Sequence, residues 1–436
     1  MEYLSQVLFA LVLVVGVGFF VKNVLRLRRN IKLGKVVDVS DHKPQRWKNM
    51  AKIALGQTKM VVRPIAGFLH IIVYIGFIII NIEVLEIIID GLLGTHRIGL
   101  KVLNESIYGF LIGSFEVLAV LVLIAVFVFW MRRNIIKLKR FLSKEMSGWP
   151  KNDGNIILYF EVVLMCLFLV MNATDTSFQM IDSGNVVSQF ITPLFSGLSE
   201  SSLHLVERSA WWLHIIGILV FLNYLYYSKH LHILLAFPNT YYGKLVPQGQ
   251  FKNLEAVTKE VQLMMDPSAD PFAAPADDAP EPEKFGASDV ADLSWVQLLN
   301  AYTCTECGRC TSECPANQTG KKLSPRKIMM DTRDRLEEVG KNIDANKGSL
   351  VEDGKQLLGD YISHEELWAC TSCNACVQAC PVSIDPLSII MDMRQYLVME
   401  QSAAPSDLNN MMGNIENNGA PWPFNQMDRL NWVAEK

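Results

Sequence analysis

Five long apolar stretches lie in the first 240 residues of this 436-residue chain, and predominantly polar sequence follows them. They cover approximately residues 3–21, 64–90, 107–131, 155–172 and 209–236. Because roughly 20 apolar residues are needed to cross a bilayer, each stretch predicts a membrane-spanning helix. The first lacks basic residues at its amino end and a small-residue cleavage site, which favours an uncleaved helix. We therefore expect residues 1–240 to form a five-helix transmembrane domain.

Lys and Arg residues are concentrated in two of the four loops between these stretches. Twelve lie between Lys22 and Arg63, and seven between Arg132 and Lys151. The other two loops contain three in all. The positive-inside bias therefore predicts a multi-pass protein of the inner (cytoplasmic) membrane, with its amino terminus outside and its carboxy-terminal half in the cytoplasm.

The polar part of the chain divides into three segments. Residues 241–292 read as a cytoplasmic segment and an acidic linker, because residues 266–292 contain five prolines, eight acidic residues and one lysine, a composition that cannot bury a core. Residues 293–400 predict a helical ferredoxin domain. Residues 401–436, rich in Asn and weakly periodic, predict an extended tail. The expected fold class is mainly α throughout, and no nucleic-acid partner is expected.

The 293–400 segment contains one cysteine motif written twice, C-x2-C-x2-C-x3-C-P, which is the ligand run of [4Fe-4S] clusters. In paired runs the fourth cysteine of each motif ligates the other cluster. One predicted cluster is therefore held by Cys304, Cys307, Cys310 and Cys380. The second is held by Cys370, Cys373, Cys376 and Cys314. Structural zinc favours two separated C-x2-C pairs, and disulfides suit an oxidising compartment, so both alternatives are disfavoured.

Several histidines lie within or near the apolar stretches, where such side chains are costly and point to function. His70 is in the second stretch, and His204, His214, His230 and His232 lie around the fifth. On one straight helix, His214 and His232 are five turns apart on the same face, about 27 Å along the axis, and His230 points roughly 160° away from His214. This geometry separates His230 from the other two.

His70 and His232 are both expected near the cytoplasmic end of the bundle, so they can meet at similar depth as axial ligands of a b-type haem. Arg63 and Lys229 lie at the same end and are candidate partners for haem propionates. The alternative is that these histidines are packing or interface residues. A second haem at the outer end would use His214, but neither His96 nor His204 is an obvious mate, so the number of haems stays open.

Four acidic residues also lie within or near the apolar stretches. They are Glu83, Glu86, Glu116 and Glu161. Two-electron quinone chemistry moves two protons, so these carboxyls are candidates for proton uptake or release beside a quinone. Glu116 is the strongest of them because it is farthest from a helix end, and the alternative is a carboxyl hydrogen-bonded to a neighbouring helix.

These residues carry a resemblance to known families. His70, the run Trp211-Trp212-Leu213-His214 and the run Ser228-Lys229-His230-Leu231-His232 make the first part similar to the cytochrome b (gamma) subunit of membrane-bound nitrate reductase and to the membrane subunit of heterodisulfide reductases. The cysteine part resembles the C subunit of heterodisulfide reductase and, more distantly, the succinate dehydrogenase iron-sulfur subunit. Nitrate reductase-type subunits carry a second histidine on helix two, where this chain has Ile80.

The resemblance implies an oxidoreductase subunit that carries electrons between the quinone pool, through b-type haem, and two cytoplasmic [4Fe-4S] clusters. This sequence lacks the Cys-Cys pair of the Cys-Cys-Gly domains that carry the substrate-side cluster in heterodisulfide-type proteins. We therefore expect the catalytic site on a partner chain, an iron-sulfur subunit with Cys-Cys-Gly domains. The rival interpretation is a haem-free membrane anchor that tethers a ferredoxin module to a complex.

Overall fold

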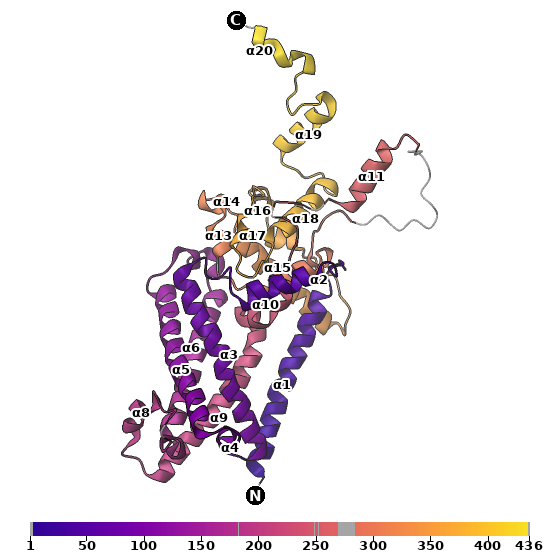
Figure 1. The fold of residues 1–436 in the computed structure, drawn as a ribbon. Helices are drawn as coiled ribbons and strands as arrows, with labels where there is room; N and C mark the ends of the chain where they lie inside the picture. Colours follow the sequence, from indigo (N-terminus) through magenta and orange to yellow (C-terminus); the bar gives the residue numbers. More distant parts are fainter. Residues whose placement is uncertain (1–2, 182, 248, 252, 269–283, 435–436) are drawn as a thin grey trace.

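The protein is described by a computed structural model that covers the chain except residues 1–2, 182, 248, 252, 269–283 and 435–436. Five long helices run side by side, and a helical domain caps one end of them (Figure 1). The long helices are α1 (Leu4–Ile31), α3 (Pro64–Leu93), α5 (Glu105–Asn134), α6 (Trp149–Thr174) and α9 (Glu200–Tyr224). All five are long and apolar enough to cross a bilayer. The predicted fold class, mainly α with a five-helix bundle before the cysteine-rich part, is confirmed.

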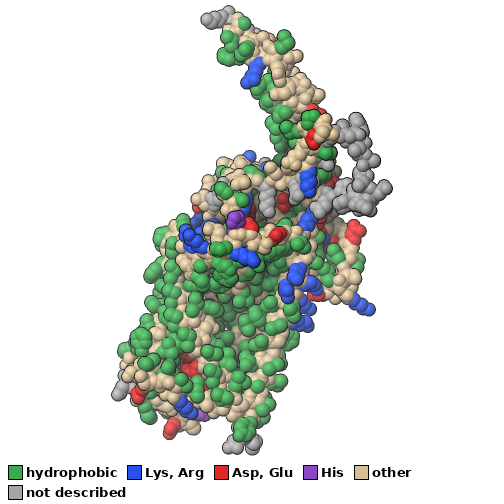
Figure 2. Space-filling model, turned by 45° about the vertical axis from the view of Figure 1, so that its right-hand side comes forward, with side chains coloured by type: hydrophobic (Ala, Val, Ile, Leu, Met, Phe, Trp, Pro, Cys, Tyr) green, Lys and Arg blue, Asp and Glu red, His purple; other side chains and the backbone are tan. Residues whose placement is uncertain are grey.

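Helix packing in the bundle leaves its flank apolar. α6 packs against α5 and α9, α3 packs against α5, and α1 lies across α3 and α9. The core between them is formed by fully buried side chains such as Ile112, Phe115 and Phe168. Hydrophobic side chains also cover the outside of the bundle, whereas Lys and Arg side chains gather at its border with the capping domain (Figure 2). An apolar flank of this extent marks a membrane protein.

The fifth helix differs from the prediction at both ends. It begins at Glu200 rather than near residue 209, because the Ser199 side chain caps it by accepting a hydrogen bond from the Ser202 backbone N–H. It ends at Tyr224, and two 3₁₀ turns, Leu225–Tyr227 and Lys229–Leu231, lead into α10 (His232–Tyr241). The expectation that His214 and His232 share one straight helix is therefore wrong, and so is the angle derived for His230.

The capping domain contains the cysteine-rich segment. Its longer helices are α12 (Trp295–Thr303), α15 (Pro325–Ala345) and α18 (Pro386–Met399). The short helices are α13 (Arg309–Ser312), α14 (Pro315–Gln318), α16 (His364–Trp368) and α17 (Ala375–Ala379). Elsewhere the chain adds α2 (Lys43–Met50), α4 (Ile98–Val102), α7 (Thr176–Gln179), α8 (Ser188–Ile191) and α11 (Glu255–Met265).

Part of the predicted acidic linker belongs to the capping domain. Ala287 and Val290 are almost fully buried, and the Ala287 backbone N–H donates to the Asp392 carbonyl at 3.0 Å. The apolar side chains in this stretch thus join the core that α12, α15 and α18 enclose. Residues 269–283 of the predicted linker lie outside the described residues.

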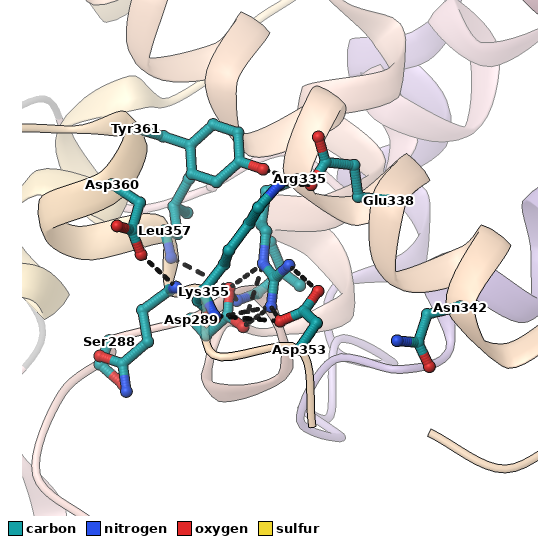
Figure 3. A network of polar contacts seen from close by, with 12 residues as sticks. Ser288, Asp289, Arg335, Glu338, Asn342, Asp353, Lys355, Leu357, Asp360 and Tyr361 are labelled. Atoms are coloured by element: carbon teal, nitrogen blue, oxygen red, sulfur yellow. Dashed lines mark hydrogen bonds and ion pairs between the residues drawn. The ribbon is translucent and has the colours of Figure 1, made fainter. Parts of the chain in front are cut away.

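A buried arginine ties the start of this domain to its middle (Figure 3). The Arg335 guanidinium, on α15, bonds to Asp289 at 2.8 Å and to Asp353 at 2.6 Å. It also donates to the Lys355 carbonyl at 2.8 Å. Burial would lower the pKa of Arg335, but its bonds to the two carboxylates outweigh this and raise it. The Arg335 charge is therefore held by two chain segments, one that precedes α12 and one that follows α15.

The long first helix joins bundle and cap. α1 continues past its apolar part to Ile31, and its last turn reaches α15, where the Arg29 side chain pairs with Asp344 and donates to the Gly340 carbonyl at 2.9 Å. The Asn30 amide donates to the Tyr302 hydroxyl at 2.9 Å. Arg29, which the charge pattern assigned to a loop, is therefore part of a helix that contacts the cap.

The predicted extended tail contains helical segments. Residues 406–418 form α19 (Ser406–Asn418), followed by a 3₁₀ segment, Gln426–Leu430, and α20 (Asn431–Ala434). These segments project away from the rest of the molecule (Figure 1), and none of their described side chains is buried. The tail is thus partly helical and makes little use of the core.

Candidate functional site

The first site is a cavity at the face of the capping domain that meets the bundle. Its lining includes Cys304, Cys307, Cys310 and Cys380, the four residues predicted to share one cluster. Cys304 and Cys307 lie in the loop before α13, Cys310 lies within α13, and Cys380 directly follows α17. Four thiols around one cavity fit the four-sulfur donor set of a [4Fe-4S] cluster.

The second site groups the other motif with Cys314. Cys314 lies within electrostatic range of both Cys370 and Cys376 and contributes to the raised pKa of each thiol, after the larger effect of burial. Cys373 is exposed, whereas Cys314 and Cys376 are buried. The exchange of fourth cysteines between the motifs stays a prediction. This second site lies nearer to solvent than the first.

The two loops share an unusual backbone conformation. In the first, Glu306 and Gly308 have φ values of 53° and 71°; in the second, the corresponding Ser372 and Asn374 have 56° and 60°. Left-handed residues at these places turn the loop tightly, so that backbone N–H groups face sulfur. The Ser372 N–H, for example, lies 3.4 Å from the Cys370 sulfur. Such donors stabilise thiolates around an iron-sulfur cluster.

Burial disfavours the deprotonated form of these thiols when no metal is bound. It raises the pKa of Cys304 and Cys376 to about 12 and that of Cys380 to about 11. Iron ligation requires the deprotonated form, so cluster binding must displace these protons. Without a metal these cysteines are therefore expected as neutral thiols.

The first-cluster loop is fastened to the bundle by charged side chains. Glu306 accepts bonds from Lys229 at 2.5 Å and from Arg333 at 2.8 Å. The Arg309 guanidinium donates to the backbone carbonyls of Lys59 and Met60 at 3.1 and 3.2 Å. These contacts place the cluster loop directly against the end of the bundle that carries the histidines.

The two predicted propionate partners take part in the same junction. Lys229 pairs with Glu306, and Arg63 bonds to Ser312 at 2.6 Å and to Glu313 at 2.9 Å. Both cations therefore already have partners on the cluster domain. Sequence reasoning missed this role because neither Glu306 nor Glu313 is distinguishable, within the cysteine motif, from an ordinary exposed acid.

Three histidines come together beside that junction. The rings of His70 and His232 have centroids 6.5 Å apart, and those of His230 and His232 are 5.4 Å apart. The His232 Nδ1 lies 3.1 Å from the Lys229 carbonyl, whereas the Nδ1 atoms of His70 and His230 are buried without a hydrogen-bond partner in the described chain. A bond from Nδ1 to a carbonyl leaves Nε2 free as a metal ligand.

The spacing of His70 and His232 fits two axial ligands. A metal-imidazole nitrogen bond is about 2 Å long, and each ring centroid lies roughly 1 Å beyond its nitrogen, so two imidazoles on opposite sides of one iron have centroids roughly 6 Å apart. The unpartnered Nδ1 atoms of His70 and His230 also mark this pocket as unusually polar for a bundle interior.

The histidines proposed for a second haem do not come together. His214 is buried, and its ring packs on Phe168 of α6, with centroids 6.4 Å apart. His204 is exposed. The His96 ring lies 3.1 Å from Asp175. None of these contacts pairs His214 with another described histidine.

The acidic residues of the bundle have unequal surroundings. Glu116 is fully buried, and its carboxylate accepts hydrogen bonds from the Asn172 amide at 3.0 Å and from the backbone N–H groups of Val187 and Ser188 at 2.7 and 3.0 Å. Three donors satisfy it as an ion that fastens α5 to α6 and α8. The structure therefore favours the structural interpretation of Glu116 over the proton carrier.

Comparisons with known proteins agree with the cysteine sites. A family described as the 4Fe-4S dicluster domain matches residues 303–384. The "Probable iron-sulfur-binding oxidoreductase FadF" of Bacillus subtilis is 28% identical over 99% of this chain and 61% of its own length. The "EtfAB:quinone oxidoreductase" of Syntrophomonas wolfei is 26% identical over 88% of this chain and 53% of its own length.

Shorter matches point the same way. The "Probable membrane-anchored ferredoxin" of Chromohalobacter salexigens is 33% identical over 36% of this chain and 25% of its own length. Subunits of Methanosarcina heterodisulfide reductases also match over 27% to 35% of the chain. No solved structure matches.

The chain is thus similar to iron-sulfur oxidoreductases, and it spans 61% and 53% of the length of the Bacillus and Syntrophomonas relatives. Its dicluster domain supports two [4Fe-4S] clusters and electron transfer through them.

Proposed function

We propose that this protein is a membrane electron-transfer subunit that links the quinone pool, through one b-type haem on His70 and His232, to two [4Fe-4S] clusters and then to a partner iron-sulfur subunit. The first cluster is assigned to Cys304, Cys307, Cys310 and Cys380, and the second to Cys370, Cys373, Cys376 and Cys314. The proposed domains are residues 1–240 (cytochrome b-like), 241–292 (segment and linker), 293–400 (ferredoxin) and 401–436 (tail).

One observation carries this proposal: the first-cluster loop and the histidine group share a junction. Lys229 immediately precedes His230 and pairs with Glu306, which immediately precedes Cys307. Arg309, between the ligands Cys307 and Cys310, bonds to the loop that leads into α3 and His70. A haem and a cluster held at these places would be neighbours, as centres arranged in series must be.

The haem would supply reversible one-electron chemistry, since bis-imidazole iron passes single electrons. His70 and His232 would hold it, and the Lys229 carbonyl would orient the His232 ring. Because Lys229 and Arg63 already bind cluster-domain residues, their expected interaction with propionates would have to be shared with those partners.

The order of the two clusters follows from exposure. The first-cluster cavity faces the bundle, whereas the second motif contains the exposed Cys373. Electrons would therefore pass between the haem and the first cluster, and then between the first and the second cluster. They would pass between the second cluster and the partner at the surface near Cys373. The partner is proposed to resemble the Cys-Cys-Gly-containing subunits of heterodisulfide reductases and to hold the substrate site. The proposed topology keeps this domain in the cytoplasm.

An optical and magnetic spectrum of the purified full chain tests this function. Dithionite reduction should produce a low-spin b-type haem band together with the signals of two reduced [4Fe-4S] clusters. Cluster signals without any haem band would show the rival, a haem-free anchor carrying a ferredoxin module. Zinc in place of iron would contradict both interpretations.

A further inference from the structure

A second polar site lies at the end of the bundle opposite the iron-sulfur domain. It is a cavity between α3, α6 and α9, closed by the loop that follows α3. Its lining comprises Glu83, Glu86, Ile87, Asp90, His96, Arg97, Met171, Glu207, Arg208 and Trp211. The space accommodates ordered water but not a quinone ring.

Negative charge exceeds positive charge around this cavity. Four carboxyls line it, and Asp175, which binds Arg97 at 2.6 Å, adds a fifth. Only two guanidiniums, those of Arg97 and Arg208, face them; His96 is the remaining titratable group on the lining. Because this end of the bundle is poorly solvated, the five carboxyl groups cannot all be ionised at once. At least one of them is expected to keep its proton.

The hydrogen bonds indicate which carboxyl that is. Asp175 is bound by Arg97 and His96, and Glu207 by Arg208. Asp90 accepts from the Ile98 N–H at 3.1 Å, and Glu86 accepts from the Gly99 N–H at 2.9 Å and the Tyr108 hydroxyl at 3.1 Å. Each of these four has donors that stabilise its ionised form.

Glu83 has no such support. It is 2% exposed, and its Oε2 is buried without any hydrogen-bond partner in the described chain. A buried carboxylate without donors is costly, whereas a protonated carboxyl with a water beside it is not. Glu83 lies on the same helix as His70, 13 residues away, which corresponds to roughly 20 Å.

We propose that this cavity is a water-filled proton-transfer site in which Glu83 carries the proton between the bundle interior and the distal end of the bundle. The proposal rests on the proposed function, because the protons that Glu83 transfers are those released or taken up in quinone chemistry. Oxidation of one quinol gives two electrons to the haem and clusters and releases two protons. Glu83 passes its own proton to a cavity water, becomes a carboxylate and is reprotonated from the quinol side; quinone reduction runs the same transfer backwards.

Infrared spectroscopy of the full chain in proteoliposomes tests this site. We expect a carbonyl band from a protonated carboxyl that shifts in D₂O, because cavity water exchanges its proton, and that is lost in Glu83→Gln. Glu105→Gln is the matched control, since Glu105 is an exposed carboxyl at the same end of the bundle. In the reduced-minus-oxidised difference spectrum the wild-type band should also change.

Two results would overturn the proposal. One is a band that persists in Glu83→Gln, which means that another group stores the proton. The other is a band that does not respond when the haem and clusters are reduced, which means that Glu83 is only a buried acid. Failure of the proposed function would appear separately, as missing haem or cluster signals, and would not alter the effect of Glu83→Gln on the static band.

Discussion

The iron-sulfur domain and the helical bundle bring their candidate ligands together in different ways. In the iron-sulfur domain, three of the four cysteines assigned to each site come from one short stretch of chain, a loop and the first turn of the helix after it, and the two loops repeat the same left-handed backbone positions. In the bundle, His70 lies on α3 and His232 begins α10, and the packing of these distant segments brings their rings together. Local motifs therefore determine the first kind of site, and helix packing determines the second.

Buried charge differs between the regions as well. In the iron-sulfur domain, buried Arg335 faces two carboxylates and buried Glu306 faces two cations. At the far end of the bundle, carboxyls outnumber arginines, and Glu83 Oε2 has no partner in the described chain. Matched charges suit a domain that holds centres rigidly, whereas unmatched acids suit a place where protons move.

The largest expected effect comes from replacing the fourth cysteine of either motif by serine. Cys380→Ser should remove the cluster that Cys304, Cys307 and Cys310 hold, and Cys314→Ser the other one, because each lies with the opposite motif. Iron content should fall from about eight to about four atoms per chain in either variant. Electron paramagnetic resonance should show which cluster is lost; loss of the cluster of the mutated motif itself would contradict the exchange.

The bundle site should be equally dependent on two residues that are far apart in sequence. His70→Ala and His232→Ala should each abolish the b-type haem band, because both axial imidazoles are needed for the low-spin state, while iron in the clusters stays at its wild-type level. His230→Ala should keep that ligation, and His204→Ala, an exposed histidine at the other end, is the control. A band that survives His232→Ala but not His230→Ala would assign the second ligand to His230.

The cysteine sites could be predicted from the sequence almost completely, and the histidine site only in part. Spacing predicts all eight cysteines as cluster ligands, and the structure brings Cys304, Cys307, Cys310 and Cys380 around one cavity. The exchange of the fourth cysteines stays a prediction. His70 and His232 were paired from their similar depth at one end of the bundle, whereas the straight-helix argument that set His230 apart fails at the break after Tyr224. The signal that could have marked that break is Ser228, whose side chain accepts a hydrogen bond from the His230 backbone N–H where a new turn begins. The cavity residues Arg97 and Asp175 were missed, since they lie in polar loops whose folding back depends on tertiary packing.

A smaller effect is expected from Glu116, the acid that the structure treats as a fastening point. Glu116→Gln should lower the free energy of unfolding in detergent by about 1–3 kcal/mol. The reason is that an amide cannot accept all the hydrogen bonds that Asn172, Val187 and Ser188 donate. Quinol-driven reduction of the haem should keep its wild-type rate in protein that remains folded. A slowed rate with unchanged stability would restore Glu116 as a proton carrier.

The smallest effect concerns pH and the iron-sulfur domain. Burial raises the pKa of Asp331 to about 6, although Lys327 at 2.6 Å partly offsets it. The folded protein thus binds this proton more tightly than the unfolded chain, so its contribution to the free energy of unfolding is complete below about pH 4 and is lost by roughly 2–3 kcal/mol as pH rises through 6.

Asp331→Asn should remove that slope. The check is the difference in unfolding free energy between wild type and this variant, measured from pH 4 to pH 7 with clusters intact. The wild type should lose stability relative to the variant over this range. A difference that stays constant, or that grows in favour of the wild type, would show that Asp331 is ionised at no cost.

Anaerobic mixing of the full chain with a reduced quinol, followed optically and by freeze-quenched paramagnetic resonance, tests the central claim that electrons pass in series. The haem band and both cluster signals should become reduced, and in His70→Ala the clusters should no longer be reduced by quinol while dithionite still reduces them. Clusters that quinol reduces at the wild-type rate in His70→Ala would contradict the account, because electrons would then reach the iron-sulfur domain without the histidine site.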